Sequence, residues 1–226
     1  MTVPSDYDDN PARWQINRDV RRRYGSGDVH AGVETRFAEE GLAPVLDVGC
    51  GEGDLARLLP DGWPWIGLDR SATQLSRASG PVVLGDATRL PFVDATFGAV
   101  ALLWMLYHVP APAAALAEAR RVLRPGGLVA ASTTSRTDSP ELAAFIRRRP
   151  TPFDAEDAPG LFREHFDEVE VDAWDAPLYH LPDGDALRNY LVGRLVPAER
   201  ADEAVATVSL PMDVTKRGVL VYGRKT

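Results

Sequence analysis

Residues 45–53 read VLDVGCGEG, a short apolar run that passes into three glycines at alternating positions. By its length, the run over residues 44–48 is typical of a buried strand that ends where Gly49 opens the glycine cluster. Glycine lets the backbone turn sharply and lets a ligand approach without a clashing β-carbon. The stretch therefore predicts a central strand followed by a ligand-binding loop at the carboxyl edge of a parallel sheet.

Strand-like and helix-like segments alternate downstream of this stretch. Helical segments of this length between strands imply right-handed crossovers, and hence a parallel sheet covered by helices on both faces. The predicted strands are residues 65–69, 81–84, 97–103 and 127–132, and the predicted helices are residues 55–59, 71–75 and 112–123.

The two ends of the chain are less regular. Residues 11–41 predict one or two helices interrupted at 25–27, with Asp28 capping the second and Val33 and Phe37 on its apolar face. Towards the other end we expect a more exposed strand at 166–174, a helix at 186–195 and a final strand at 218–222.

The spacing of acids and glycines distinguishes two classes of nucleotide site. Asp69 ends the second strand, 18 residues after Gly51, where a carboxylate can accept both hydroxyls of a ribose. Dinucleotide sites use G-x-G-x-x-G, whereas here the third glycine comes one residue early and Asp54 stands in its place. Glu52 and Asp54 would also repel a pyrophosphate, so a cationic ligand without phosphates suits this loop better than NAD.

Four stretches in order resemble the class I S-adenosylmethionine-dependent methyltransferases, in particular the ubiquinone-biosynthesis-type group. They are VLDVGCGEG at 45–53, GLDRS at 67–71, GDATRLPF at 85–92 and RVLRPGG at 121–127. The resemblance implies an α/β, Rossmann-like, doubly wound sheet of seven strands in the order 3-2-1-4-5-7-6, with strand 7 antiparallel.

The resemblance also implies S-adenosyl-L-methionine as the cofactor. The glycines would pass under its methionine portion, Asp69 would hold the ribose and Arg70 would lie beside the adenine. Asp86 would accept from the adenine amino group, and the Ala87 backbone would contact the ring edge. The implied cofactor-binding residues are Asp47, Gly49, Cys50, Gly51, Gly53, Asp69, Arg70, Asp86, Ala87 and Leu103.

We expect one domain in three parts. Residues 1–42 form an N-terminal helical lid, 43–135 the cofactor-binding core, and 136–226 a substrate-side insert with the last two strands. In this arrangement the segment 176–216 and the lid wall the substrate pocket.

Tyr107 and His108 are the candidate catalytic residues, because they follow the fourth strand in the loop that faces the transferable methyl in this family. His108 is either a general base or a residue that organises the loop, and Tyr107 either binds the nucleophile or is a wall residue. Residues 179–180 lie where the family places substrate loops, whereas His30 and His165 are expected on the surface.

Aromatic residues outside the core motifs concentrate in the predicted lid and pocket wall. Together they indicate a concave, mostly apolar site for a small planar or hydrophobic substrate. They are Tyr7, Trp14, Tyr24, Trp104, Tyr107, Trp174, Tyr179 and Tyr190.

Composition narrows the function classes further. A net charge of −8 and a pI near 5.0 weigh against a nucleic-acid partner, and the arginine clusters at 21–23 and 147–149 are expected to be solvated helix faces. The longest uncharged apolar run, residues 99–106, is too short to span a membrane. With Cys50 as the one cysteine, no intrachain disulfide can form, and scattered histidines predict no metal site.

We therefore expect a cytoplasmic enzyme, monomeric or homodimeric, that methylates oxygen, nitrogen or carbon of a small molecule and releases S-adenosylhomocysteine. Methylation of RNA or protein, and a catalytically silent cofactor-binding partner protein, remain as alternatives. The sequence does not identify the acceptor.

Overall fold

The computed structural model describes residues 10–146 and 149–226 and shows one seven-stranded sheet. Its strand order is β3-β2-β1-β4-β5-β7-β6, as predicted, with β7 antiparallel to both of its neighbours. The strands are β1 (Val45–Val48), β2 (Trp65–Asp69), β3 (Val82–Leu84), β4 (Phe97–Leu103), β5 (Leu123–Thr134), β6 (Glu168–Leu181) and β7 (Met212–Arg224).

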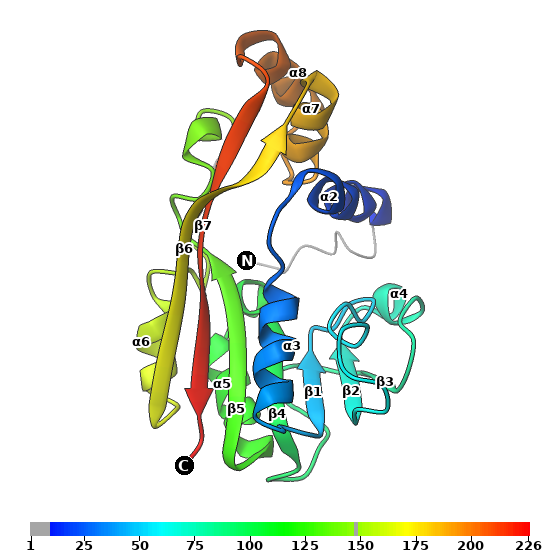
Figure 1. Ribbon diagram of the computed structural model, residues 1–226, viewed down its shortest axis with the longest axis vertical. Coiled ribbons are helices and arrows are strands. Elements are labelled where there is room, and N and C mark those ends of the chain that lie inside the picture. The colour runs from blue at the N-terminus through cyan, green and yellow to red at the C-terminus, as the bar shows by residue number, and fades with distance from the viewer. Residues whose placement is uncertain (1–9, 147–148) are drawn as a thin grey trace.

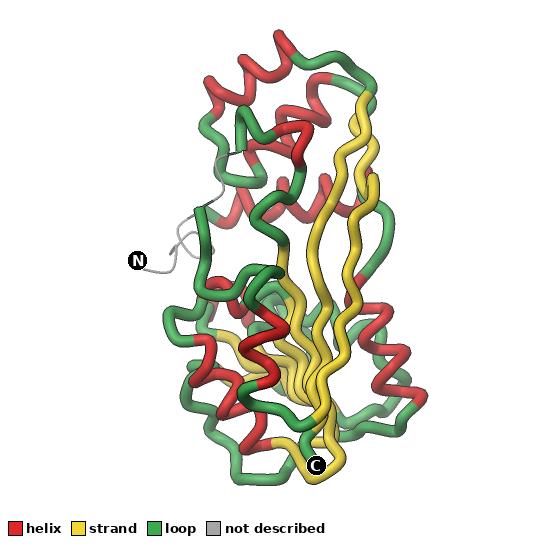
Figure 2. Tube along the Cα trace, turned by 90° about the vertical axis from the view of Figure 1, so that its left-hand side faces the viewer, coloured by secondary structure: helices red, strands yellow, loops and turns green. Residues whose placement is uncertain are grey.

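Helices cover both faces of the sheet (Figure 2). Side chains of β4 alternate between two apolar clusters: Val100 and Leu102 face one, and Ala99 and Ala101 face the other. On the first face lie α5 (Pro112–Val122) and α6 (Ala158–Arg163); on the second lies α3 (Val29–Glu39). This two-sided burial is what a doubly wound parallel sheet requires.

The last two strands are much longer than predicted. Beyond the end of β5, residues 175–181 of β6 pair with β7, and Tyr179 also bridges to Gly25, so the two strands form an arm that extends past the sheet (Figure 1). The arm carries α7 (Gly184–Val192) and α8 (Ala198–Thr207), which share a third apolar cluster with it. The hydrophobic pattern underestimated β6 because nearly all of its residues are exposed or half-exposed.

The predicted helix at 55–59 was wrong, because the structure has consecutive turns over this segment. Gly51 and Gly53 both have positive φ angles, and Pro60 follows closely, so few residues are left for regular helical geometry. Of the three leucines whose spacing predicted the helix, Leu55 and Leu59 are buried, whereas Leu58 is exposed. The short α4 (Ala72–Leu75) forms as expected, capped by Ser71.

In the described part of the chain, two helices precede the first strand of the sheet. α2 (Pro11–Tyr24) ends before Gly25, and α3 begins after the N-cap Asp28, whose side chain accepts from the backbone N–H of His30. Val33 and Phe37 of α3 are fully buried. α2 lies between the tip of the arm and the carboxyl ends of β1 and β2 (Figure 1).

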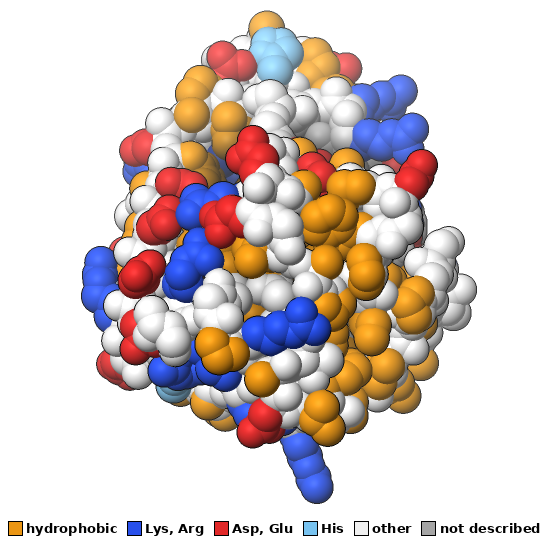
Figure 3. All heavy atoms as spheres, turned by 60° about the horizontal axis from the view of Figure 1, so that its bottom comes forward, with side chains coloured by type: hydrophobic (Ala, Val, Ile, Leu, Met, Phe, Trp, Pro, Cys, Tyr) orange, Lys and Arg blue, Asp and Glu red, His pale blue; other side chains and the backbone are white. Residues whose placement is uncertain are grey.

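Charged side chains of both signs intersperse on the face shown in Figure 3, with apolar side chains gathered to one side. Many of the arginines form ion pairs, among them Arg36 with Glu40 and Arg217 with Asp175. Of the two predicted arginine clusters, Arg21 pairs with an acid of the glycine loop, while 147–148 lie outside the described residues. Within the described residues, no helix is both long and apolar enough to cross a bilayer.

Candidate active site

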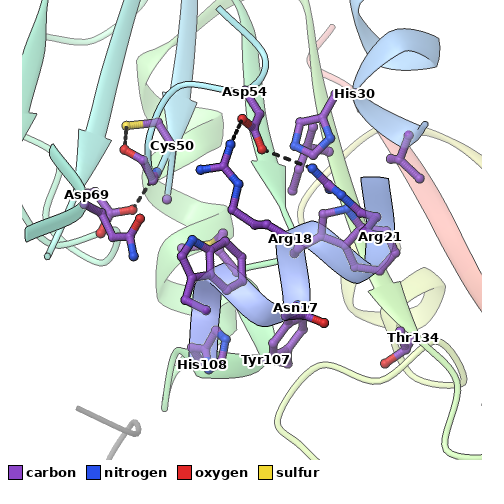
Figure 4. A pocket seen from close by; sticks show the side chains of 18 of the residues that line it. Asn17, Arg18, Arg21, His30, Cys50, Asp54, Asp69, Tyr107, His108 and Thr134 are labelled. Carbon is purple, nitrogen blue, oxygen red and sulfur yellow. Dashed lines mark hydrogen bonds and ion pairs between the residues drawn. The ribbon is translucent and has the colours of Figure 1, made fainter. Parts of the chain in front are cut away.

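A cavity of about 1120 Å³ lies at the carboxyl edge of the sheet. Its floor is formed by the ends of β1, β2, β3 and β4, and it continues beneath α2 towards the β6–β7 arm (Figure 4). This is the edge at which open α/β sheets bind their ligands.

The three glycines of the first loop all adopt positive φ, but they differ in what surrounds them. A β-carbon on Gly49 would lie 2.7 Å from Cβ of Met105, so this glycine makes room for a protein side chain. A β-carbon on Gly51 would have Oε1 of Gln74, at 3.9 Å, as its one neighbour within 4 Å. Gly51 is therefore the glycine beside which a ligand has space to bind.

Asp69 is held by two backbone groups of the site. Its Oδ2 accepts from the N–H of Gly51 and its Oδ1 from the N–H of Ser71, each at 2.9 Å. A carboxylate oxygen has more than one lone pair, so both oxygens can still accept from a ligand.

Asp86 is oriented in a similar way at the end of β3. Its Oδ1 accepts from both the N–H and the hydroxyl of Thr88, at 2.8 Å each. These hydrogen bonds lower the pKa of the Asp86 carboxyl, which favours its ionised, acceptor-only form. Its Oδ2 is left for a donor such as an amino group.

Most of the residues predicted for the site line this one cavity. They are Gly49, Cys50, Gly51, Asp69, Arg70, Asp86, Ala87, Leu103, Tyr107 and His108.

Two predicted cofactor-binding residues do not line it. Gly53 lies against the ring of Trp65, and Asp47 is buried at the end of β1. Burial raises the pKa of Asp47 to about 7, and the nearby carboxylates of Asp69 and Asp54 add to the rise while His30 opposes it. The position of Asp47 suits a structural role beneath the loop better than ligand contact.

Gln74 is a lining residue that the sequence reasoning missed. It is 3% exposed, and neither its amide nitrogen nor its amide oxygen has a hydrogen-bond partner among the described residues. An unsatisfied buried amide is costly, so this side chain fits a ligand that both donates and accepts hydrogen bonds. The sequence signal that could have identified Gln74 is its position three residues after the helix cap Ser71, at the end of β2.

Ion pairs fasten α2 over the glycine loop. Arg18 binds both Glu52 and Asp54, and Arg21 binds Asp54 at 3.1 Å (Figure 4). The repulsion of a pyrophosphate expected from Glu52 and Asp54 is therefore reduced, because arginines neutralise both carboxylates. His30, expected on the surface, lies instead in the cavity wall with a side chain only 12% exposed.

His108 and Tyr107 lie side by side in the short 3-10 helix η1 (Leu106–His108), with ring centroids 4.3 Å apart. Burial, helped by the positive charges of Arg13 and Arg70, lowers the pKa of His108 to about 4. The imidazole is therefore neutral at pH 7 and can accept a proton.

Aromatic rings form much of the remaining wall. Trp104 adopts a left-handed backbone conformation, φ +57°, at the end of β4, and its ring meets that of Trp174 edge to face at 5.9 Å. Such backbone strain in a non-glycine residue concentrates at functional sites. The predicted aromatic residues that line the cavity are Trp14, Trp104, Tyr107, Trp174 and Tyr179.

The other residues proposed for the wall lie elsewhere. Tyr24 packs against the apolar cluster of the arm, Tyr190 is fully buried in it, and Tyr7 lies outside the described residues. Tyr179 and His180 belong to strand β6 rather than to a loop, and His180 is exposed and pairs with Asp213 at 2.7 Å. In the part of the chain that the structure describes, no three His, Cys, Asp or Glu side chains are grouped to hold a metal ion.

Similarity to known proteins centres on the glycine loop and the strand ends around it. Residues 46–131 match a family model described as a methyltransferase domain. The demethylmenaquinone methyltransferase of Lactiplantibacillus plantarum is 39% identical over 113 residues, covering 43% of this chain and 48% of the relative. A ubiquinone/menaquinone biosynthesis C-methyltransferase of Cupriavidus taiwanensis is 34% identical over 144 residues, covering 56% and 59%. The chain thus spans about half the length of the curated relatives it matches.

Solved structures share the fold at low identity. A SAM-dependent methyltransferase from Archaeoglobus fulgidus is 17% identical with a TM-score of 0.56, covering 87% of this chain and 94% of that one. The [4+2]-cyclase SpnF is 18% identical with a TM-score of 0.63, covering 100% and 99%. A cyclase among these neighbours shows that the fold alone does not select the reaction. Residues 46–131 nevertheless match a model of the methyltransferase domain, and the chain shares its fold with a solved SAM-dependent methyltransferase.

Proposed function

We propose that this protein is an enzyme that transfers a methyl group from S-adenosyl-L-methionine to a small-molecule acceptor, releasing S-adenosylhomocysteine. The observation that carries the proposal is the continuity of the cavity. One half is lined by the glycine loop, Asp69 and Asp86, and the other by α2 and the β6–β7 arm. Its volume of about 1120 Å³ exceeds the roughly 300–1,000 Å³ of most single-ligand sites, so a cofactor and an acceptor fit together.

The cofactor half suits an adenosyl ligand. The fixed carboxylate of Asp69 can accept from two ribose hydroxyls, and Oδ2 of Asp86 can accept from an adenine amino group. Gly51 leaves open space at the loop, and the buried amide of Gln74 lies beside it in need of partners. When bound, S-adenosyl-L-methionine supplies an electrophilic methyl carbon on a sulfonium.

The chain's own task is to position the acceptor, exclude water and take up a proton where one is lost. The acceptor's nucleophile forms a bond to the methyl carbon as the carbon–sulfur bond breaks, and sulfur keeps the electron pair. The neutral imidazole of His108 can receive a proton from an O–H or N–H nucleophile. A carbon or already deprotonated nucleophile would need only the apolar surroundings that Tyr107 and Trp104 supply.

A small acceptor is favoured over a macromolecule because α2 lies across the cavity. Arg18 fastens this helix to the glycine loop, and Arg13 donates to the carbonyl of Gly193 beyond α7 at 2.6 Å. A macromolecule could reach the cavity only after these contacts had opened. The acceptor half is formed largely by residues outside 46–131, so the substrates in the relatives' names are not assigned to this chain.

A thermal-shift titration with S-adenosylmethionine, S-adenosylhomocysteine and NAD in parallel tests the cofactor. A ligand at 100 times its dissociation constant stabilises the folded state by about 2.7 kcal/mol. We expect the two adenosyl-sulfur ligands to raise the melting temperature and NAD to leave it unchanged. A shift with NAD alone would contradict the proposal.

A further inference from the structure

Charge is distributed unevenly around the cavity. The acidic lining residues all lie in the cofactor half or at the α2–α3 junction: Asp28, Glu52, Asp54, Asp69 and Asp86. The far end, formed by α2, the arm and the segment after α7, has no acidic lining residue among those described, but it has Arg13, Arg194 and Lys216.

Of these three basic residues, Lys216 is bound within the protein. Its ammonium is ion-paired with the buried carboxylate of Asp138 and lies 3.1 Å from the hydroxyl of Ser139 and 3.3 Å from that of Tyr190. The hydroxyls of Ser139 and Tyr190 are in turn 2.9 Å apart. This network joins the buried Tyr190 of α7 to Lys216 of β7.

Arg194 lies on the ring of Tyr190. Its guanidinium carbon is 3.5 Å from the ring centroid of Tyr190 and 5.2 Å from that of Tyr179. Nη1 donates to the carbonyl of Tyr190 at 3.1 Å, and none of the ion pairs among the described residues involves Arg194. A guanidinium has five N–H donors in a planar fork, so this pre-oriented arginine can still bind a carboxylate.

The backbone next to Arg194 supports this interpretation. Leu195 ends the α7 segment with φ +64° and is 58% exposed, although glycine is the usual residue for this left-handed position. The turn places both Arg194 and the half-exposed Leu195 in the lining of the cavity. Strain retained in an exposed non-glycine residue beside a charged lining residue points to a binding role.

We propose that the methyl acceptor is a flat aromatic compound that bears a carboxylate, and that Arg194 binds this carboxylate. The aromatic part lies along the wall that Trp104 and Trp174 form, and the methylated atom is a second group near Tyr107 and His108. This inference rests on the proposed methyltransferase function, because it assigns the acceptor class of the same cavity.

Binding of paired probes to the protein saturated with S-adenosylhomocysteine tests the inference. The probes are 4-hydroxybenzoate and 3,4-dihydroxybenzoate, each compared by calorimetry with its neutral primary amide. Charge-assisted hydrogen bonds predict about 10- to 100-fold tighter binding of the carboxylates. Arg194→Gln should abolish that preference, and Arg194→Lys should restore part of it because the charge remains but the planar fork is lost.

Arg188→Gln is the matched control, since Arg188 lies on α7 but pairs with Asp202 outside the cavity. It should leave carboxylate binding unchanged. Equal binding of acids and amides, no binding of either acid, or an unchanged preference in Arg194→Gln would overturn the inference. Because S-adenosylhomocysteine binding is measured first in every variant, its absence in the wild type would instead contradict the proposed function.

Discussion

The backbone N–H of Gly51 donates a hydrogen bond to Oδ2 of Asp69, with 2.9 Å between nitrogen and oxygen. This bond joins the loop after β1 to the end of β2. The same carboxylate accepts from Ser71 at the start of α4, so one side chain orients the glycine loop, a strand end and a helix start. The residue proposed to hold the ribose is thus also the residue that shapes the loop beneath the rest of the cofactor.

Replacing Asp69 by alanine should therefore have two effects. We expect at least tenfold weaker binding of S-adenosylhomocysteine, and a melting temperature lower by a few degrees because two N–H groups lose a charged acceptor. Calorimetric binding and thermal unfolding measure the two effects. Asp61→Ala, in an exposed turn, is the control and should change neither. Wild-type affinity in Asp69→Ala would remove Asp69 from the site.

Gln74→Leu should weaken the binding of S-adenosylhomocysteine without lowering the stability of the unliganded protein. Leucine fills a similar volume and removes two buried polar atoms that have no partner among the described residues, so the unliganded protein should be as stable as the wild type or more stable. Affinity for S-adenosylhomocysteine should fall about tenfold, as one or two hydrogen bonds are lost. Ser76→Ala, at the exposed end of the same helix, should alter neither quantity. A variant that binds as the wild type does would show that Gln74 makes no ligand contact.

Asp47 should make stability depend on pH in a defined direction. Its pKa is raised to about 7 in the folded state, so between about pH 4 and 7 the folded state holds a proton that the unfolded state has released. Stability must then fall as pH rises through this window. Denaturant unfolding of Asp47→Asn should show a stability gain over wild type that is about 2–3 kcal/mol larger at pH 8 than at pH 5. A gain independent of pH would contradict the raised pKa.

His108 should titrate well below neutrality. Its pKa is lowered to about 4 by burial and by the charges of Arg13 and Arg70, so NMR should find the imidazole neutral throughout pH 6–8. Turnover should then show no inflection from His108 in that range, and Arg70→Gln should raise its pKa. If His108 is the general base, His108→Ala should lower turnover by about 10²- to 10⁴-fold while cofactor affinity stays within twofold. Full activity in His108→Ala would leave it only an organising role in the loop.

Removing the ion pairs of Arg18 should weaken the attachment of α2 to the glycine loop. Arg18→Ala removes the bridge to Glu52 and Asp54, and we expect faster amide hydrogen exchange in α2 by about fivefold, equivalent to about 1 kcal/mol. The dissociation of S-adenosylhomocysteine should accelerate as well. Arg22→Ala on the exposed face of the same helix should change neither rate. Equal exchange in the two variants would show that Arg18 does not fasten the helix.

Local pattern predicted the core of this protein well. The strand before Gly49, the glycine loop and the helix after β2 can each be predicted from a few neighbouring residues. Strand burial, positive φ and helix capping depend on short stretches of sequence. The boundaries of β4 were predicted without error, since both of its faces are buried and its sequence is continuously apolar. Resemblance to a family then supplied the strand order.

The sequence by itself thus determined the sheet, the glycine loop and the residue types at its edge. Only the tertiary structure decided that Asp47 lies beneath the loop, that Arg18 neutralises Glu52 and Asp54, and that Arg194 lies on Tyr190 in the cavity wall. The ion pairs of Arg18 join residues more than thirty positions apart. Contacts at such separations depend on how helices and strands pack. Hydrophobic periodicity predicts the helices and strands themselves but not which of their side chains meet.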